Sequence, residues 1–223
     1  QFRAAIDLDP SFARAYSALA LASVDDFRYQ WSQDSGRSAE LALDLATKAV
    51  ALDKELPQAH WVLGYVHLFG NGNHEQALAM GQRTIALDPN HADGYALLAV
   101  THVYAGQSER ARALISEAMR LNPDSPSQYA AVLGYARFFS GDYTGARRAL
   151  EQALEINVNR LMPNLYLTAT YVRLNEIDDG RWHAENIRQA NPEFDLEHWA
   201  SRQPFKDQNQ LESVVRDLRT AGL

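Results

Sequence analysis

Apolar residues recur along this chain three and four positions apart, the spacing that places side chains on one face of an α-helix. The aromatic residues Trp61, Tyr65 and Phe69 stand four apart. The last set with helical spacing is Leu211, Val214, Val215 and Leu218. The pattern predicts an all-α chain.

Asp-Pro and Asn-Pro steps interrupt the helical pattern at regular intervals. A proline has no backbone N–H and pushes its predecessor out of the helical region, so each step ends one helix and admits the next. The steps end at Pro10, Pro89, Pro123 and Pro192, and the equivalent places between them are Lys54 and Val158. The successive intervals are 44, 35, 34, 35 and 34 residues. Within the intervals, Gly106 and Gly141 supply the left-handed residue that ends a first helix.

A period of 34 residues with small residues where two helices touch resembles the tetratricopeptide repeat. The third interval carries the repeat's characteristic residues at Tyr95, Leu98, Ala99, Gly106, Ala111, Ile115, Ala118 and Pro123. The resemblance implies an α-α superhelix, a solenoid of about five helix-turn-helix repeats closed by a C-terminal capping helix. Repeat two is weaker in its second helix, where Gly81 and Thr84 replace a bulky and a small apolar residue.

The period divides the chain into seven expected segments. They are 1–10, the end of a truncated upstream repeat; 11–54, repeat one; 55–89, repeat two; 90–123, repeat three; 124–158, repeat four; 159–192, repeat five; and 193–223, a C-terminal cap. Because the first segment reads as the tail of a second helix, we expect the chain to be part of a longer protein. In the cap, we expect Asp207 to begin a final helix, with Gln210 three residues on as in a capping box.

Repeat one is about ten residues longer than the other repeats. We expect the extra residues between its two helices, because solenoid repeats accept insertions in their loops. The insert includes residues 25–32, with the aromatic residues Phe27, Tyr29 and Trp31, followed by Ser32. Two interpretations are open. The insert extends the first helix and covers that helix's apolar end, or it contacts a partner at the edge of the array.

Composition excludes several classes of function. The net charge of −7 argues against a nucleic-acid or anionic-membrane surface, which needs clustered lysine and arginine. The chain has no cysteine, and it has no signal-peptide profile or stretch of about 18 apolar residues. We therefore expect a cytoplasmic protein. The sequence has no phosphate-binding loop, no nucleophile elbow and no His-Glu-x-x-His pair, so we expect neither an enzyme nor a cofactor.

Three histidines are the only arrangement that suggests a metal. His67 and His102 occupy the same place in the first helices of neighbouring repeats, and His60 is a turn or two from His67. A metal site needs three or four converging ligands. The position usually holds a packed tyrosine, so we interpret the histidines as packing residues and predict no metal.

The first helices of such repeats line a concave groove, and side chains four apart point into it. The predicted groove residues are Trp61, Tyr65, Phe69, Tyr104, Tyr135, Phe138, Phe139 and Arg173. This face is aromatic and has little positive charge, unlike the lysine- and arginine-rich clamp that grips peptide carboxylates. It suits an apolar peptide or helix. Two alternatives are open: some of these aromatic residues pack between helices, or the final helix, the insert or an upstream domain fills the groove.

The chain also resembles a narrower group, the C-terminal tetratricopeptide region of bacterial class III adenylate/guanylate cyclase-like proteins. The residues that carry this resemblance are 9–20, 60–64 and 204–223, together with Trp31-Ser32 in the insert. The resemblance implies that a cyclase domain lies N-terminal in the parent protein. The cyclase's metal-binding aspartates have no counterpart here, so no catalytic residue is carried over.

The sequence thus favours a non-catalytic interaction and regulatory module. It would bind an apolar peptide, a helix or the protein's own upstream domain, and in the parent protein it would control a cyclase. The alternatives are a self-association scaffold and the sensor arm of a bacterial transcriptional regulator.

Overall fold

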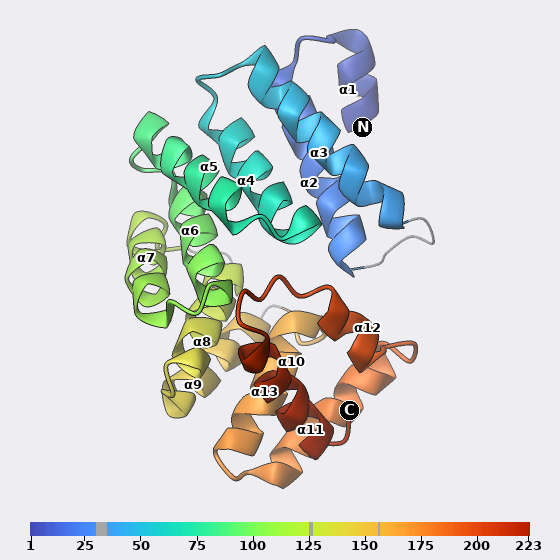
Figure 1. The fold of residues 1–223 in the computed structure, drawn as a ribbon, viewed down its shortest axis with the longest axis vertical. Coiled ribbons are helices and arrows are strands. Elements are labelled where there is room, and N and C mark those ends of the chain that lie inside the picture. Colours follow the sequence, from blue (N-terminus) through green and yellow to red (C-terminus); the bar gives the residue numbers. More distant parts are fainter. Residues whose placement is uncertain (30–34, 125–126, 156) are drawn as a thin grey trace. The chain divides into compact units, whose positions relative to one another are not determined.

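A computed structural model describes residues 1–29, 35–124, 127–155 and 157–223. These residues form thirteen α-helices and no strand (Figure 1). The helices are α1 (Phe2–Leu8), α2 (Ala13–Tyr29), α3 (Ser35–Leu52), α4 (Pro57–Asn71), α5 (His74–Leu87), α6 (Ala92–Tyr104), α7 (Ser108–Leu121), α8 (Ser127–Phe139), α9 (Tyr143–Leu154), α10 (Leu161–Arg173), α11 (Ile177–Ala190), α12 (Leu196–Ser201) and α13 (Gln208–Thr220). The all-α class predicted from the sequence is confirmed.

The chain divides into two compact units, Gln1–Thr101 and His102–Leu223, with the boundary inside α6. In the first unit, α2 pairs with α3 and α4 pairs with α5, while α4 also packs against α2 and α3. In the second unit, α8 pairs with α9 and α10 pairs with α11, while α10 also packs against α8, α9 and α13. Each unit is therefore built from helix pairs in which a first helix contacts the preceding pair.

Small residues allow the two helices of a pair to approach closely. A Cβ atom added to Gly64 in α4 would lie 2.9 Å from the Cβ of Met80 in α5. A Cβ atom added to Gly134 in α8 would lie 2.6 Å from the Cγ of Leu150 in α9. Because carbon atoms in ordinary contact are about 3.5–4.0 Å apart, no larger residue fits at either position unless the neighbouring residue of the partner helix moves.

The weak positions of repeat two have a packing role. A Cβ atom on Gly81 would lie 2.7 Å from a methyl carbon of Leu98, so the small residue in α5 makes room for a leucine of α6. Thr84 is fully buried and its hydroxyl donates to the carbonyl oxygen of Met80 at 2.9 Å. At Gly81 the missing side chain is therefore replaced by Leu98, and at Thr84 the buried hydroxyl has a hydrogen-bond partner.

The turns inside four helix pairs share one geometry. Each turn contains one residue with a positive φ angle: Gly72 at 66°, Gly106 at 76°, Gly141 at 82° and Asn175 at 62°. In each, the N–H one residue later donates to a carbonyl oxygen of the preceding helix; the pairs are Asn73 to His67, Gln107 to His102, Asp142 to Arg137 and Glu176 to Tyr171, at 2.8–3.0 Å. Asparagine tolerates the left-handed region better than other non-glycine residues, so Asn175 takes the place of glycine.

The turns between helix pairs depend on a carboxylate or amide oxygen. A side-chain oxygen accepts the N–H two residues later at 2.9–3.0 Å; the acceptors are Asp9, Asp53, Asp88 and Asn157. This Asx turn forms without proline, because Lys54 follows Asp53 and Val158 follows Asn157. The irregular positions in the proline series are explained by the residue that precedes each of them.

Two segments lie outside the regular pairs. Residues 25–29 of the insert continue α2, while Trp31 and Ser32 lie outside the described residues. At the other end of the chain, the Asp207 side chain accepts the N–H of Asn209 at 3.0 Å and begins α13 as predicted. Gln210, the expected second member of a capping box, directs its side-chain amide toward Gly106.

Candidate functional site

The predicted aromatic row of the first unit lies along α4 and is largely covered. The ring centroids of Trp61 and Tyr65 are 6.2 Å apart, and those of Tyr65 and Phe69 are 4.7 Å apart. Only 9% of Trp61 and 6% of Phe69 is exposed. The His91 ring lies 6.4 Å from the Trp61 ring. The three side chains do share one helix face, as their spacing requires.

Arg28, near the end of α2, covers this row. Its guanidinium carbon lies 3.8 Å from the centroid of the Phe69 ring, a cation–π contact, and its Nη1 donates to the hydroxyl oxygen of Tyr65 at 2.6 Å. The Tyr65 hydroxyl in turn donates to Asp25 Oδ1 at 3.2 Å. Burial raises the pKa of both Tyr65 and Asp25, while the charge of Arg28 acts to lower both. The sequence reasoning missed Arg28, because nothing in the repeat pattern fixes the direction of a side chain in an insert.

In the second unit, Tyr135 and Phe138 lie between two first helices. The Tyr135 ring centroid is 4.3 Å from that of Tyr166 on α10, and the Phe138 centroid is 5.9 Å from it. Both predicted groove residues are 4% exposed, so they form core between α8 and α10. A partner does not reach them in this conformation.

The segment between α12 and α13 covers the remaining aromatic residues of the predicted groove. The Phe205 ring lies 4.9 Å from the Tyr104 ring and 5.4 Å from the Phe139 ring, with both pairs edge to face. Tyr104 is fully buried and Phe205 is 5% exposed. The backbone N–H of Lys206 donates to the carbonyl oxygen of Tyr104 at 2.9 Å, where α6 ends. A carbonyl at a helix end has no partner within the helix, so this bond satisfies it.

Arg173, the one cation placed in the groove, also contacts the C-terminal part of the chain. Its Nε donates to Asp217 Oδ2 at 2.6 Å, and another guanidinium nitrogen donates to the Ser213 hydroxyl. The Asp217 side chain is only 9% exposed. Burial raises the pKa of Asp217, while the hydrogen bond and charge of Arg173 oppose the rise. Helix α13 thus supplies the counterion of Arg173.

The histidines do not form a metal site in the described part of the chain. His60 Nε2 lies 2.9 Å from the carbonyl oxygen of Lys54, and burial lowers the pKa of His67 and His102. His67 belongs to the first unit and His102 to the second. The described residues contain no group of three or more histidine, cysteine, aspartate or glutamate side chains placed to hold a metal ion.

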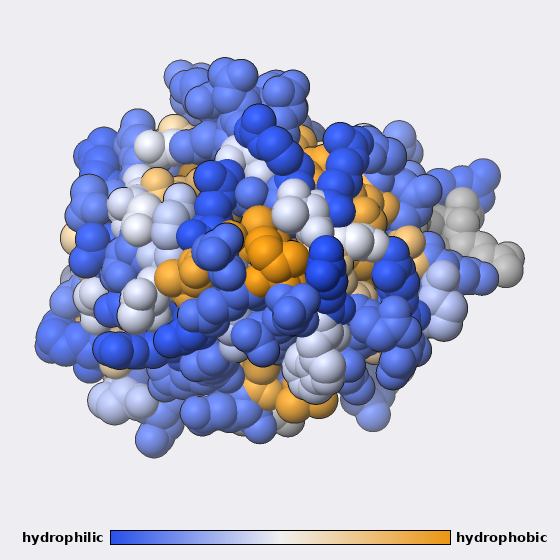
Figure 2. All heavy atoms as spheres, turned by 90° about the horizontal axis from the view of Figure 1, so that it is seen from below, coloured by the Kyte–Doolittle hydropathy of each residue, from blue (hydrophilic) through white to orange (hydrophobic). Residues whose placement is uncertain are grey.

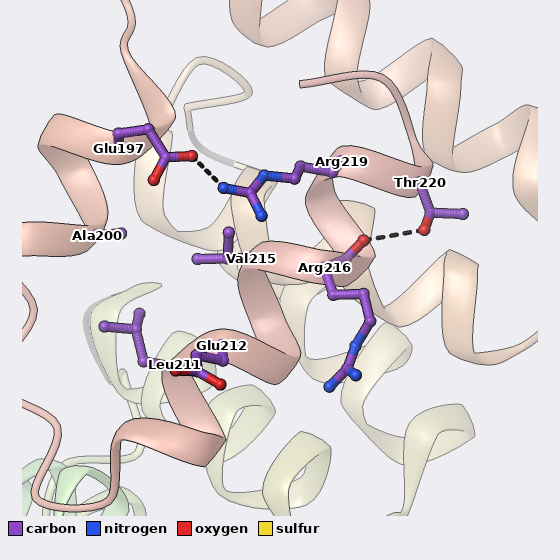
Figure 3. A pocket seen from close by; sticks show the side chains of 8 residues that line it. All are labelled: Glu197, Ala200, Leu211, Glu212, Val215, Arg216, Arg219 and Thr220. Carbon is purple, nitrogen blue, oxygen red and sulfur yellow. Dashed lines mark hydrogen bonds and ion pairs between the residues drawn. The ribbon is translucent and has the colours of Figure 1, made fainter.

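A hollow of about 710 Å³ lies between α12 and α13 (Figure 3). Ala200, Leu211 and Val215 supply its apolar lining, and an ion pair between Glu197 and Arg219 spans it. On the molecular face seen in Figure 2, apolar side chains gather in small patches among polar ones. The lining of this hollow carries charges of both signs, Glu197 and Glu212 with Arg216 and Arg219.

Searched over its described residues, the chain has no helix of the length and apolarity that crossing a bilayer requires.

Family models identify the repeats directly. Three models of the tetratricopeptide repeat match residues 33–92, 68–134 and 127–159, which together span more than half of the chain. A comparison of the sequence with curated proteins finds no match. Residues 33–159 therefore consist of tetratricopeptide repeats, as the residue pattern predicted.

Solved structures agree on the fold. A thermophilic tetratricopeptide protein of Thermus thermophilus, TTC0263, is 23% identical with a TM-score of 0.63, over 74% of this chain and 91% of that chain. PilF of Pseudomonas aeruginosa is 19% identical with a TM-score of 0.64, over 96% and 88%. YrrB, described as having an unusual peptide-binding site, is 18% identical with a TM-score of 0.51, over 86% and 93%. At these identities the likeness concerns the fold alone.

Proposed function

Because this chain is built from tetratricopeptide repeats, which generally serve as protein-interaction modules, we propose that it binds apolar segments through its aromatic first-helix face. We also propose that, in the second unit, the chain's own residues 202–207 occupy this face. The contact of Phe205 with Tyr104 and Phe139 is the observation that carries the proposal. Proteins of this fold are typically non-catalytic.

The docked segment indicates what kind of ligand the face accepts. Residues 202–207 are not helical, and their contacts with the face include the aromatic anchor Phe205 and a backbone hydrogen bond from Lys206 to Tyr104. Burying a phenylalanine side chain contributes about 1.5–3 kcal/mol, and a typical hydrogen bond adds about 1 kcal/mol. Such a sum is modest for a free peptide. It is sufficient for a tethered segment, whose effective concentration reaches about the millimolar range.

A partner must therefore compete with the tethered segment. The partner's apparent affinity equals its intrinsic affinity multiplied by the fraction of molecules in which the segment is released. A partner with a similar aromatic anchor and additional contacts would displace residues 202–207. The second unit would then bind only those partners whose affinity for the face is high enough to displace residues 202–207.

Peptide binding to a substituted chain tests the proposal. The probe is a peptide with the sequence of residues 201–209, added up to about 10 mM because the contacts above predict a dissociation constant in the millimolar range, and binding is followed by chemical-shift changes in NMR spectra of the chain. We expect Phe205→Ala to bind it more tightly than the unsubstituted chain, because the face is vacated. Leu41→Ala, which removes an apolar side chain that is 39% exposed on α3 of the first unit, is the control and is expected to change nothing.

The peptide supplies a second control. A version with alanine at the position of Phe205 should not bind Phe205→Ala. If Phe205→Ala binds the native peptide no better than the unsubstituted chain, or binds both peptides equally, the aromatic face is not a segment-binding site.

The α4 row remains a second proposed contact of the same module. A partner there would have to displace Arg28 from the Phe69 ring. Trp61→Ala combined with Phe69→Ala should then abolish capture of partners in a pull-down from the source cells. An unchanged set of captured proteins would remove α4 from the binding face.

Control of a cyclase in a longer bacterial, cytoplasmic parent protein is proposed from the sequence resemblance alone. It is tested by sequencing the coding region upstream of Gln1. A cyclase domain found there would direct the next assay to cyclic AMP formation with and without Phe205→Ala. A DNA-binding domain would favour the sensor-arm alternative.

Self-association is a second candidate function, favoured by the exposed apolar residues of the first unit. Phe2 is 45% exposed, Leu8 is 88% exposed and Phe12 is 44% exposed. All three fall within the first twelve residues, and contiguous exposed apolar patches mark interaction sites. Light scattering tests this: a mass that rises with concentration and returns to the monomer value in Leu8→Glu would support self-association, and a constant monomer mass would exclude it.

A further inference from the structure

A second groove of the second unit is lined by residues other than those of the predicted first-helix groove. It has a volume of about 690 Å³ and is lined by the second helices α9 and α11, by part of α10 and by the loop after α9. Ligand pockets commonly have volumes of about 300–1,000 Å³. None of the residues of the proposed groove on the first-helix face contributes to it.

Two large apolar side chains are exposed at this groove. Trp182 on α11 is 63% exposed and Val158 in the loop is 67% exposed, and both line it. Tryptophan is the residue most enriched at energetically important contacts, and it is rarely left this open on a surface. Leu154 and Leu167 provide an apolar floor between them.

The groove's polar groups are held in a fixed arrangement. The Tyr171 hydroxyl donates to Glu151 Oε1 at 3.1 Å, which positions the carboxylate at the wall. The Tyr171 ring stacks on the His183 ring with centroids 5.2 Å apart, and the Trp182 ring meets the His183 ring edge to face at 4.8 Å. His183 also lies 3.4 Å from Asn164 Oδ1. The Glu151 carboxylate and the Trp182 indole, both at the groove, are thus connected through Tyr171 and His183.

The charge of the lining has one sign. Among the residues that line the groove, the charged ones are Glu151 and Glu155, and none is lysine or arginine. Burial lowers the pKa of His183, so this histidine is neutral at pH 7 and does not offset the carboxylates. Arginines of the same two helices pair with carboxylates outside the lining: Arg147 with Glu176, Arg181 with Asp178 and Arg188 with Glu185.

We propose that this groove binds a segment of a partner protein that carries an arginine or lysine beside an apolar residue. The cation pairs with Glu151 and Glu155 and lies on the exposed face of Trp182. The neighbouring apolar side chain contacts Val158 and the apolar floor. An acidic segment is rejected by the two carboxylates, because like charges brought together in a partly enclosed site repel each other.

Binding of matched peptides to the full chain tests this proposal. The first probe is a labelled pentapeptide that alternates leucine and arginine. The second replaces each arginine with citrulline, which keeps the shape and removes the charge. We expect the arginine peptide to bind with a dissociation constant below about 1 mM and at least about fivefold more tightly than the citrulline peptide.

Substitutions in the groove localise the contact. Glu151→Gln and Trp182→Ala should each weaken binding of the arginine peptide about threefold to fivefold. Glu40→Gln removes the same charge at an exposed position of α3 and is expected to have no effect. Circular dichroism checks that each variant keeps its helices, and Glu151→Gln preserves an acceptor for Tyr171.

Three results would overturn the proposal. The first is the absence of binding up to about 1 mM arginine peptide. The second is equal binding of the two peptides, which would show a purely apolar contact. The third is equal behaviour of Glu151→Gln and Glu40→Gln, which would show that the peptide responds to net charge alone.

Discussion

A methyl group added to Gly134 should destabilise the second unit. The added Cβ would lie 2.6 Å from the Cγ of Leu150 and 2.7 Å from one of its methyl carbons, whereas ordinary contacts are about 3.5–4.0 Å. Leu150 of α9 is fully buried, so its side chain cannot move out into solvent to make room without leaving its packed position. Forcing a methyl group into such a core costs about 1–3 kcal/mol, and a contact this short lies toward the upper end.

Helix propensity acts in the opposite direction and sets the net value. Alanine is more favourable than glycine inside a helix by about 1 kcal/mol, so Gly134→Ala should lower the free energy of unfolding by a net of about 1–2 kcal/mol, or about 2–8 °C in melting temperature. Gly70→Ala is the matched control. Its Cβ would lie 3.5 Å from the nearest atom, a methyl carbon of Val66, so it should stabilise the chain by up to about 1 kcal/mol.

Urea unfolding followed by circular dichroism measures both changes, and hydrogen exchange of peptides from α8 and α9 localises the loss. If Gly134→Ala proves as stable as the unsubstituted chain, or more stable, the close approach of α8 to α9 is not as described. A lower free energy of unfolding for Gly70→Ala would show that helix propensity does not determine the effect of alanine at this position.

Three further predictions concern the sites. Tyr65→Phe should lower the free energy of unfolding by about 1–2 kcal/mol, because the Tyr65 hydroxyl bonds to the charged side chains of Arg28 and Asp25. The control Tyr95→Phe removes a hydroxyl whose bond at 3.3 Å is exposed, so it should change the free energy by less than about 0.5 kcal/mol. Urea unfolding measures both changes. Arg173→Met should destabilise the C-terminal helix, because a buried carboxylate at Asp217 loses its counterion; hydrogen exchange of α13 should rise, and equal exchange would contradict this. Burial lowers the pKa of His183, so the unfolded chain binds a proton that the folded chain does not as pH falls below about 6.5, and stability should decline there; His183→Gln should show a shallower decline in melts from pH 7.5 to 5.5.

The repeat architecture was accessible from the sequence because its determinants are local. The spacing of Trp61, Tyr65 and Phe69 correctly placed them on one face of α4, and Gly106 and Gly141 correctly marked turns. The pattern did not reveal Asn175, since one asparagine among many carries no signal until its φ angle is known. Nor did it reveal that Asx turns explain the boundaries without proline.

The cover of the aromatic faces was not predictable in the same way. Arg28 belongs to the insert and Phe205 to the segment after the last repeat, and neither has an equivalent position in other repeats that would indicate its direction. Periodicity also does not separate neighbours on one helix face. Tyr135 and Phe139, four apart on α8, both contact the Tyr166 ring, but Phe139 also contacts Phe205. Occupation of the groove by the chain itself was open as an alternative, but its residues were not identifiable.

The way residues 202–220 contact the second unit affects how that unit unfolds. A plain repeat array has contacts only between neighbours, so it can lose repeats one at a time from an end. Here Phe205 reaches the ends of α6 and α8, and Asp217 reaches the end of α10, so one segment joins helices from successive repeats. Detaching the segment removes contacts from three first helices together. The second unit should consequently unfold as one cooperative block, and its resistance to fraying should depend on the last residues of the chain.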